Sequence, residues 1–354
     1  MTSEKLFQSY FKHSPQIHAS AHGRVNLIGE HTDYNGGYVL PTLIPQQISV
    51  AISLRDDQQI LGTSKEYGEL QADLISPTDN SWLDFVRGAI HFIQLEGAKI
   101  QGLNIAVTSD IPSGAGLSSS AALEVAILRA LSSLFNITIP STQLALIGQK
   151  IEHEFVGAQC GIMDQMVCAN TKLGEVLFLD CESLQTQIIP QFPEHRFLVI
   201  HSGSSRKLSE GNYNQKKSET SQAAQFLNIP SLRHATLDLV NTINNDVILR
   251  RARHIVSENS RVLQSLECLK KNDPKTFGEL MYQSHQSMVK DYEISSAELN
   301  DLVDAAKLAG ALGARLTGAG FGGCVVVLTS KDESEKVAGF IANQCPNSSL
   351  VAVI

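Results

Sequence analysis

A loop rich in glycine and serine, between a predicted strand and a predicted helix, most constrains what this chain can fold into. The loop reads Asp110-Ile-Pro-Ser-Gly-Ala-Gly-Leu-Ser-Ser-Ser-Ala-Ala122. Apolar residues alternate over 103–107 just before it, which predicts a strand. Apolar residues recur at helical spacing over 123–134 just after it. The chain is therefore predicted to pass from a strand through a tight turn into the first turn of a helix.

Such a loop can present several backbone N–H groups to one anion, and the helix dipole favours the same site. Gly114 and Gly116 allow a close approach of the backbone to a ligand. The serines at 118–120 can cap the helix or reach a metal or a phosphate. An ordinary strand-to-helix turn with serine caps is the alternative interpretation. The loop lacks the Gly-Lys-Ser/Thr of a Walker A motif and the third glycine of a dinucleotide-binding motif.

The composition indicates a globular protein with more than one domain. A length of 354 residues favours two domains, and we expect the change near residue 183, giving 1–183 and 184–354. The net charge of −8 argues against a nucleic-acid surface. The six cysteines form no C-x-x-C pair, which argues against a zinc site or a disulfide framework and favours the cytoplasm. No run of 18 apolar residues exists, so no membrane segment is expected.

Charged residues are concentrated in a second stretch near the N-terminus. Arg24, Glu30, His31 and Asp33 lie within ten residues of one another, around an apolar Val-x-Leu-Ile. Arginine, carboxylate and imidazole groups recognise vicinal hydroxyls through directional hydrogen bonds. A solvated loop with incidental charges is the alternative, because Asn-Gly-Gly follows as a plain turn signal.

Two further carboxylates lie in the middle of the chain. Glu152 is on a predicted helix over 142–155 but off its apolar face, which is where solvated glutamates usually lie. Asp164 lies between Met163 and Gln165, where it is either a helix cap or a carboxylate in a partly apolar catalytic site. The pattern is mostly helical over 215–305, with breaks near Pro230 and Pro274. A second glycine-rich loop within 313–324 then leads into an apolar strand.

Three separated segments together resemble the galactokinases, within the superfamily of galactokinase, homoserine kinase, mevalonate kinase and phosphomevalonate kinase. Gly23-Arg-Val-Asn-Leu-Ile-Gly-Glu-His-Thr-Asp-Tyr-Asn35 is similar to the galactokinase signature. Gly114-Ala-Gly-Leu-Ser-Ser-Ser-Ala-Ala122 and Gly318-Ala-Gly-Phe-Gly-Gly323 are similar to the ATP loop and the third motif of the superfamily. The resemblance spans roughly residues 20 to 330, with His22 where many members have proline.

The resemblance implies an α+β, two-domain sugar kinase with its active site in the interdomain cleft. It implies a galactokinase that transfers the γ-phosphate of ATP to the C1 hydroxyl of D-galactose, in galactose catabolism, with ATP and Mg²⁺ as cofactors. It implies catalytic roles for Asp164 and Arg24. The sugar would be bound by Glu30, His31, Thr32, Asp33, Gly161 and Tyr213. The ATP phosphates would be bound by Gly114, Ala115, Gly116, Leu117, Ser118, Ser119 and Ser120, and the metal by Ser120 and Glu152.

Several alternatives stay open at the level of sequence. Asp164 either removes the proton of the C1 hydroxyl or only orients that hydroxyl, since a neighbouring Arg24 would weaken it as a base. A kinase for a related sugar, such as N-acetylgalactosamine, has the same motifs. A non-catalytic sugar and ATP sensor is a third possibility, although the ATP loop, Arg24 and Asp164 are all present. We expect a monomer, and Arg206 and Lys207 receive no role.

Overall fold

The computed structural model describes residues 1–204 and 209–354, so Arg206 and Lys207 lie outside the described residues. The chain divides into two compact units. Unit 1 consists of Met1–Gly23, Gln46–Pro112 and Ser118–Asn170. Unit 2 consists of Arg24–Pro45, Ser113–Leu117 and Thr171–Ile354. Each unit combines a sheet with helices gathered beside it, which is the α+β class. The boundary between residues 183 and 184 stays a prediction.

Unit 1 is built on a mixed sheet. The sheet includes the strands β1 (Ile17–Asn26), β3 (Pro41–Leu54), β4 (Gln59–Ser64), β5 (Gly68–Asp73) and β6 (Leu103–Ser109). β3 pairs antiparallel with β6, from Ile48 opposite Ser109 to Leu54 opposite Leu103. β6 runs parallel to β4, and β4 forms a hairpin with β5. The predicted strand over 103–107 is confirmed, because its alternating apolar residues lie in the core of this sheet.

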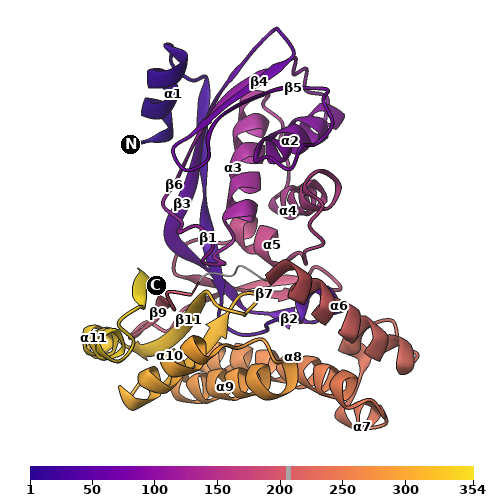
Figure 1. Cartoon of the computed structure of the whole chain (residues 1–354), viewed down its shortest axis with the longest axis vertical. Helices are drawn as coiled ribbons and strands as arrows, with labels where there is room; N and C mark the ends of the chain where they lie inside the picture. The colour runs from indigo at the N-terminus through magenta and orange to yellow at the C-terminus, as the bar shows by residue number, and fades with distance from the viewer. Residues whose placement is uncertain (205–208) are drawn as a thin grey trace. The chain divides into compact units, whose positions relative to one another are not determined.

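The helices of unit 1 are α1 (Ser3–Phe11), α2 (Leu83–Leu95), α3 (Ser119–Leu134), α4 (Ser141–Ile151) and α5 (Met163–Asn170). Figure 1 shows α1 on one side of β3 and β6, and α2, α4 and α5 gathered around α3 on the opposite side. The predicted helix over 142–155 has a regular α-helical part only to Ile151. It continues as a π-helical turn, Glu152–Val156, which ends at Gly157 in the left-handed conformation. Such turns are frequent at functional sites.

Unit 2 contains an antiparallel sheet in the order β10 (Gly313–Thr317), β11 (Cys324–Ser330), β9 (His195–His201) and β12 (Ser349–Val353). It also contains β2 (Tyr38–Val39), β7 (Glu175–Asp180) and β8 (Thr186–Pro190). β8 was not predicted, because Ile189 is its one buried residue and no alternation is visible in the sequence. The apolar strand predicted after the second glycine-rich loop is β11, whose residues are buried from Cys324 to Thr329.

The helices of unit 2 are α6 (Ser209–Phe226), α7 (Leu237–Val240), α8 (Asp246–Lys271), α9 (Pro274–Ser287), α10 (Ala297–Leu308) and α11 (Ser334–Gln344). The predicted helical region and its breaks are confirmed, and Pro274 is the first residue of α9, where its missing N–H costs no helical hydrogen bond. Helices α8 and α9 lie side by side (Figure 1). Within the described residues, no helix is long and apolar enough to cross a membrane.

Phe277 provides a test of how strongly the core of unit 2 depends on packing. Its side chain is fully buried, and its ring centroid lies 5.4 Å from that of Phe192 and 6.0 Å from that of Phe197. Phe277→Ala should lower the free energy of unfolding by about 3–5 kcal/mol, because it removes buried area and leaves a cavity. Phe226→Ala is the control, since that ring is 57% exposed. Equal losses in urea unfolding of the two variants would contradict the assigned core.

Candidate functional site

The turn after β1 brings the charged residues of the first motif into unit 2. Gly29 has a φ of +104°, and a Cβ there would lie 2.6 Å from the carbonyl oxygen of Tyr38. Thr32 is fully buried, and its hydroxyl lies 2.8 Å from the Gly29 carbonyl oxygen and 2.7 Å from that of Tyr38, to either of which it can donate. The predicted sugar residue Thr32 therefore closes the turn that presents its neighbours.

Glu30 follows Gly29 and is held on three sides. Its Oε1 accepts a hydrogen bond from the backbone N–H of Gly318, and its Oε2 accepts one from Nδ2 of Asn26. Nη2 of Arg315 lies 3.6 Å from the same Oε2. Burial raises the pKa of the Glu30 carboxyl, and these groups together with Arg24 oppose that effect. The glycine-rich loop between β10 and β11 thus supports the carboxylate of the first motif.

His31 has a φ of +62° and belongs to a hydrogen-bonded row of rings. Its Nε2 lies 3.2 Å from the carbonyl oxygen of Ala319, and its Nδ1 lies 2.7 Å from the hydroxyl of Tyr34. The Tyr34 hydroxyl in turn lies 2.8 Å from that of Tyr292. Because a carbonyl cannot donate, Nε2 carries a proton; with a neutral imidazole, Tyr34 then donates to Nδ1 and Tyr292 donates to Tyr34. Burial raises the pKa of both tyrosines, which keeps both hydroxyls protonated.

The other two predicted sugar residues of unit 2 lie beside this row. Tyr213 of α6 is half-buried, with its ring centroid 5.6 Å from that of His31 and 5.3 Å from that of Tyr34. Asp33 is half-buried at the start of a short 3-10 turn, Asp33–Asn35. Unit 2 therefore brings together a carboxylate, an imidazole and aromatic faces, which suits a ligand with several hydroxyls and an apolar face.

Arg24 is buried and fastens the glycine part of the predicted ATP loop, which also belongs to unit 2. Its Nη1 donates to the carbonyl oxygen of Gly116 over 2.9 Å, and its backbone N–H donates to that of Leu117 over 3.0 Å. Gly114 and Gly116 have φ angles of +72° and +73°, which glycine adopts without strain. Ala115 and Leu117 are buried between and beside them. The loop is thus anchored at both its apolar side chains and its carbonyl groups.

The serine part of the loop belongs to unit 1. Ser118 precedes α3 in the left-handed conformation, with a φ of 59°, and its side chain caps no helical N–H of the described chain. Its hydroxyl donates instead to Oδ2 of Asp164 over 2.5 Å. Asp164 is half-buried in the first turn of α5, and Ser119 and Ser120 are half-buried in the first turn of α3. The capping interpretation thus does not hold for Ser118, which orients a carboxylate.

Glu152 lies at the start of the π-helical turn, close to a carboxylate that the sequence analysis did not single out. Glu124 of α3 is fully buried, and its Oε2 accepts a hydrogen bond from Nε2 of Gln165 over 3.1 Å. Burial and the neighbouring Glu152 raise the pKa of Glu124 well above its ordinary value. Glu124 lies four residues after Ser120, so both residues are on one face of α3. This spacing is the sequence signal that could have identified Glu124. The predicted Gly161 is buried between Cys160 and α5 in the same unit.

The side chains of Ser120 and Glu152 have the chemistry that Mg²⁺ prefers. Oε1 of the buried Glu124 has no hydrogen-bond partner among the described residues, which leaves one buried polar oxygen unsatisfied in this part of unit 1. The described residues contain no group of three or more His, Cys, Asp or Glu side chains that could enclose a metal. Magnesium is normally held by one or two carboxylates together with substrate phosphates, so this donor set fits it.

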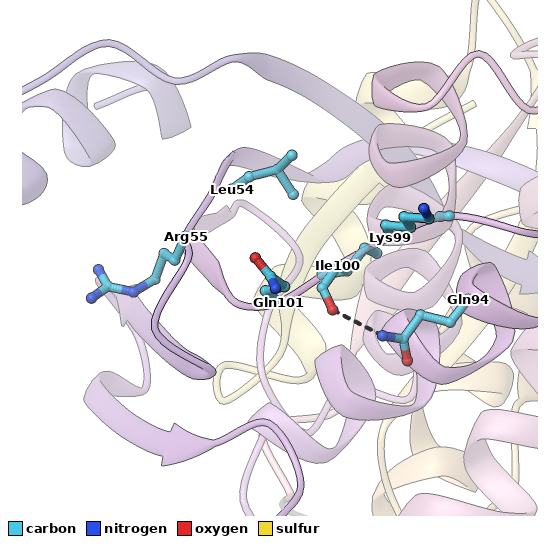
Figure 2. Close-up of a pocket in the computed structure, with 7 residues that line it drawn as sticks. Leu54, Arg55, Gln94, Lys99, Ile100 and Gln101 are labelled. Atoms are coloured by element: carbon cyan, nitrogen blue, oxygen red, sulfur yellow. Dashed lines mark hydrogen bonds between the residues drawn. The ribbon is translucent and has the colours of Figure 1, made fainter.

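A separate pocket of unit 1 lies far from the serine loop. It has a volume of about 550 Å³ and is lined by Leu54, Arg55, Gln94, Ala98, Lys99, Ile100 and Gln101. Figure 2 shows the side chain of Gln94 hydrogen-bonded to the carbonyl oxygen of Ile100 beside it, over 2.9 Å. The pocket adjoins the start of β6, whereas the serine loop follows the end of that seven-residue strand. It is therefore not part of the candidate site.

The buried hydroxyl of Thr32 generates a test of its role in the turn. Thr32→Val should lower the free energy of unfolding by about 1–3 kcal/mol, because two buried carbonyl groups lose their nearby donor. Thr242→Val is the matched control, since that hydroxyl also donates to a carbonyl but is exposed. Urea unfolding of both variants makes the comparison. A Thr32→Val protein as stable as the wild type would show that the hydroxyl does not close the turn.

Comparisons with known proteins agree with this geometry. Three family models match the chain: the galactokinase galactose-binding signature over residues 5–54, the N-terminal domain of GHMP kinases over 84–172, and the C-terminal domain of GHMP kinases over 265–347. The first model covers the turn with Glu30 and His31, and the second covers the ATP loop, Glu152 and Asp164. The third covers Arg315 and the glycine-rich loop after β10.

Solved structures give the same result over almost the whole chain. Galactokinase of Lactococcus lactis, complexed with galactose, is 31% identical, with a TM-score of 0.93 over 99% of this chain and 96% of that one. Mevalonate kinase of Methanococcus jannaschii is 21% identical, with a TM-score of 0.70 over 93% and 95%. Phosphomevalonate kinase of Streptococcus pneumoniae is 16% identical, with a TM-score of 0.74 over 96% and 99%. The last two share the two-domain α+β fold, and the identity and coverage of the first show that this chain belongs to the galactokinase family.

Proposed function

We propose that this chain transfers the γ-phosphate of ATP to the C1 hydroxyl of D-galactose, giving galactose 1-phosphate and ADP. The observation that carries the proposal is the fixed conformation of the turn after β1, which contains Glu30 and His31. Glu30 and His31 lie side by side there with their polar atoms oriented by Gly318 and Ala319, within the segment that matches a galactose-binding signature. The galactokinase that is 31% identical to this chain was solved with galactose bound.

In unit 2, the carboxylates of Glu30 and Asp33 would accept hydrogen bonds from sugar hydroxyls, and His31 would contribute its imidazole. Tyr213 would pack its ring against the C–H face of the sugar, as aromatic rings do with apolar surfaces. In unit 1, Gly161 would line the sugar with backbone alone. Directional hydrogen bonds of this kind favour one arrangement of hydroxyls over its epimers.

The phosphates of ATP would be bound by the backbone N–H groups of residues 114–120 and by the start of α3. Arg24 would add a fixed positive charge close to the transferred group, since it is anchored to Gly116 and Leu117. Ser120 and Glu152 would hold Mg²⁺, which when bound neutralises charge on the phosphate oxygens. This arrangement accounts for a phosphate loop without a lysine.

Asp164 would act on the attacking hydroxyl. Its carboxylate is oriented by the hydroxyl of Ser118, so one oxygen is fixed while the group as a whole stays half-buried. A carboxylate in this position either removes the proton of the C1 hydroxyl or aligns that hydroxyl with the γ-phosphorus. Both roles require the negative charge and the fixed orientation that Ser118 supports.

We also propose that the chain works as a monomer in the cytoplasm. The six cysteines are free thiols in the part of the chain that the structure describes. Free thiols are typical of reducing compartments. The monomeric state stays a prediction, which a measurement of the mass of the protein in solution tests.

The substrate assignment is tested by ADP release from Mg·ATP with single acceptors. Galactose should be turned over rapidly, and glucose, arabinose, mevalonate and homoserine should not. The reason is that Glu30, His31 and Asp33 are proposed to recognise the arrangement of hydroxyls in galactose. Rapid turnover of N-acetylgalactosamine instead would agree with a sugar kinase but contradict galactose as its substrate, because the two sugars differ at C2. Binding of galactose and ATP with no turnover of any acceptor would contradict the enzyme and favour a sensor.

Asp164→Asn should abolish turnover of galactose, with a loss of at least about 10²–10⁴-fold in kcat, because the neutral amide neither accepts the proton nor carries the charge. ATP binding, measured by titration calorimetry, should stay close to that of the wild type. The half-buried position makes this isosteric change compatible with folding. Turnover like that of the wild type would remove Asp164 from the mechanism.

The metal assignment has a matched pair of variants on one turn. Glu152→Gln should raise the Mg²⁺ concentration needed for half-maximal rate, because a neutral amide binds the cation more weakly than a carboxylate. Glu154→Gln should not, since Glu154 is exposed on the same π-helical turn. The assignment fails if the two variants respond to Mg²⁺ in the same way.

A further inference from the structure

A row of four buried charged side chains runs through unit 2 from α8 to the turn that presents Glu30. Nε of Arg261 lies 2.6 Å from Oε2 of Glu258. Nη2 of Arg315 lies 4.0 Å from Oε1 of Glu258 and 3.6 Å from Oε2 of Glu30. The signs alternate along the row, and the four side chains are at most 10% exposed. Buried charges are costly unless each has a partner, so the members depend on one another.

Glu258 holds the backbone immediately before Glu30. Its Oε1 accepts a hydrogen bond from the backbone N–H of Gly29 over 2.9 Å and one from the hydroxyl of Ser284 over 2.6 Å. Burial alone would raise the pKa of Glu258, but Arg261, His254 and Arg315 outweigh it and bring the pKa to about 2. The residue is therefore a charged acceptor at neutral pH, and such hydrogen bonds are stronger than neutral ones.

Arg315 holds the other end of the same turn. It is fully buried on β10, and its Nη1 donates to the carbonyl oxygen of Asn26 over 3.0 Å. Its Nε donates to the hydroxyl of Ser284 over 3.1 Å, which joins it to Glu258. Asn26 donates in turn to Glu30 through Nδ2. Arg315 thus acts on Glu30 both directly, by charge, and through Asn26.

His254 holds the carbonyl group of Glu30 itself. Its Nε2 lies 3.2 Å from that oxygen, and its Nδ1 lies 2.9 Å from the hydroxyl of Ser287. Burial lowers the pKa of His254 to about 4, so the ring is neutral at pH 7. The proton must then be on Nε2, which donates to Glu30, while Nδ1 accepts from Ser287. Three side chains from distant parts of the sequence, Glu258, Arg315 and His254, therefore fix the backbone at and before Glu30.

We infer that Glu258, Arg315 and His254 are positioning residues, which hold Glu30 in the orientation required to bind the sugar. The inference rests on the proposed function, because it takes Glu30 as a contact of galactose. Side chains that only stabilised the fold would affect unfolding and leave the affinity for the sugar unchanged. Loss of a positioning residue should therefore raise the KM for galactose, whereas loss of a residue that only stabilises the fold should not.

The test compares Arg315 with an equally buried arginine in unit 1. Arg315→Met should raise the KM for galactose by roughly tenfold or more, because small displacements of a binding group are costly. The KM for ATP should stay within about twofold, since the ATP loop keeps its own anchors. Arg315→Lys should recover part of the loss, because it keeps the charge.

Arg87→Met is the control. Arg87 is 3% exposed and paired with Asp84, so this variant should lose stability with no change in the KM for galactose.

Glu258→Gln keeps the shape of the side chain and decides the question if Arg315→Met does not fold. It should raise the KM for galactose without a matching change for ATP. A folded Arg315→Met or Glu258→Gln with the KM of the wild type for galactose would overturn the inference, as would an equal rise in Arg87→Met. Glu30→Gln separates this failure from that of the proposed function. If Glu30→Gln binds galactose as the wild type does, the sugar contact itself is wrong.

Discussion

The candidate site depends on holding one carboxyl group, that of Glu30, in a fixed orientation although it is almost fully buried. A bare carboxylate loses most of its hydration on burial, and no single hydrogen bond compensates for that loss. The structure surrounds it with the N–H of Gly318, the amide of Asn26 and the guanidinium of Arg315. These partners come from segments almost 300 residues apart in the chain. The first and third sequence motifs therefore form one structural feature, since each supplies half of the same set of hydrogen bonds.

The proposed phosphate loop differs from this carboxylate, because its own backbone would supply most of the contacts to the ligand. Its glycine part is anchored by Arg24, and its serine part orients Asp164 through Ser118. The positive end of α3 and N–H groups of a loop backbone favour an anion in general, an attraction that other phosphate loops obtain partly from a lysine. Such a loop needs small residues more than charged ones.

The sequence predicted the strands and helices that carry a regular apolar pattern, including β6, α3 and β11. It missed β8, which has a single buried side chain, and it extended the helix of Glu152 through a π-helical turn that no period reveals. Among the proposed site residues, local motifs singled out Glu30, His31 and Asp164. Arg315, Glu258 and Tyr292 were missed because their importance comes from long-range contacts. An arginine inside an apolar strand next to a glycine loop was the one visible signal for Arg315.

Delivery of the phosphoryl group to the anomeric hydroxyl is the central step of the proposed reaction, and the product of the reaction tests it most directly. We would record the phosphorus and proton NMR spectra of the product formed from galactose and Mg·ATP. The account predicts a phosphorus nucleus coupled to the single anomeric proton, which is the signature of galactose 1-phosphate. Coupling of phosphorus to the two protons on C6 would place the phosphate at the other end of the sugar. That result would contradict the orientation in which Glu30 and His31 are proposed to hold it.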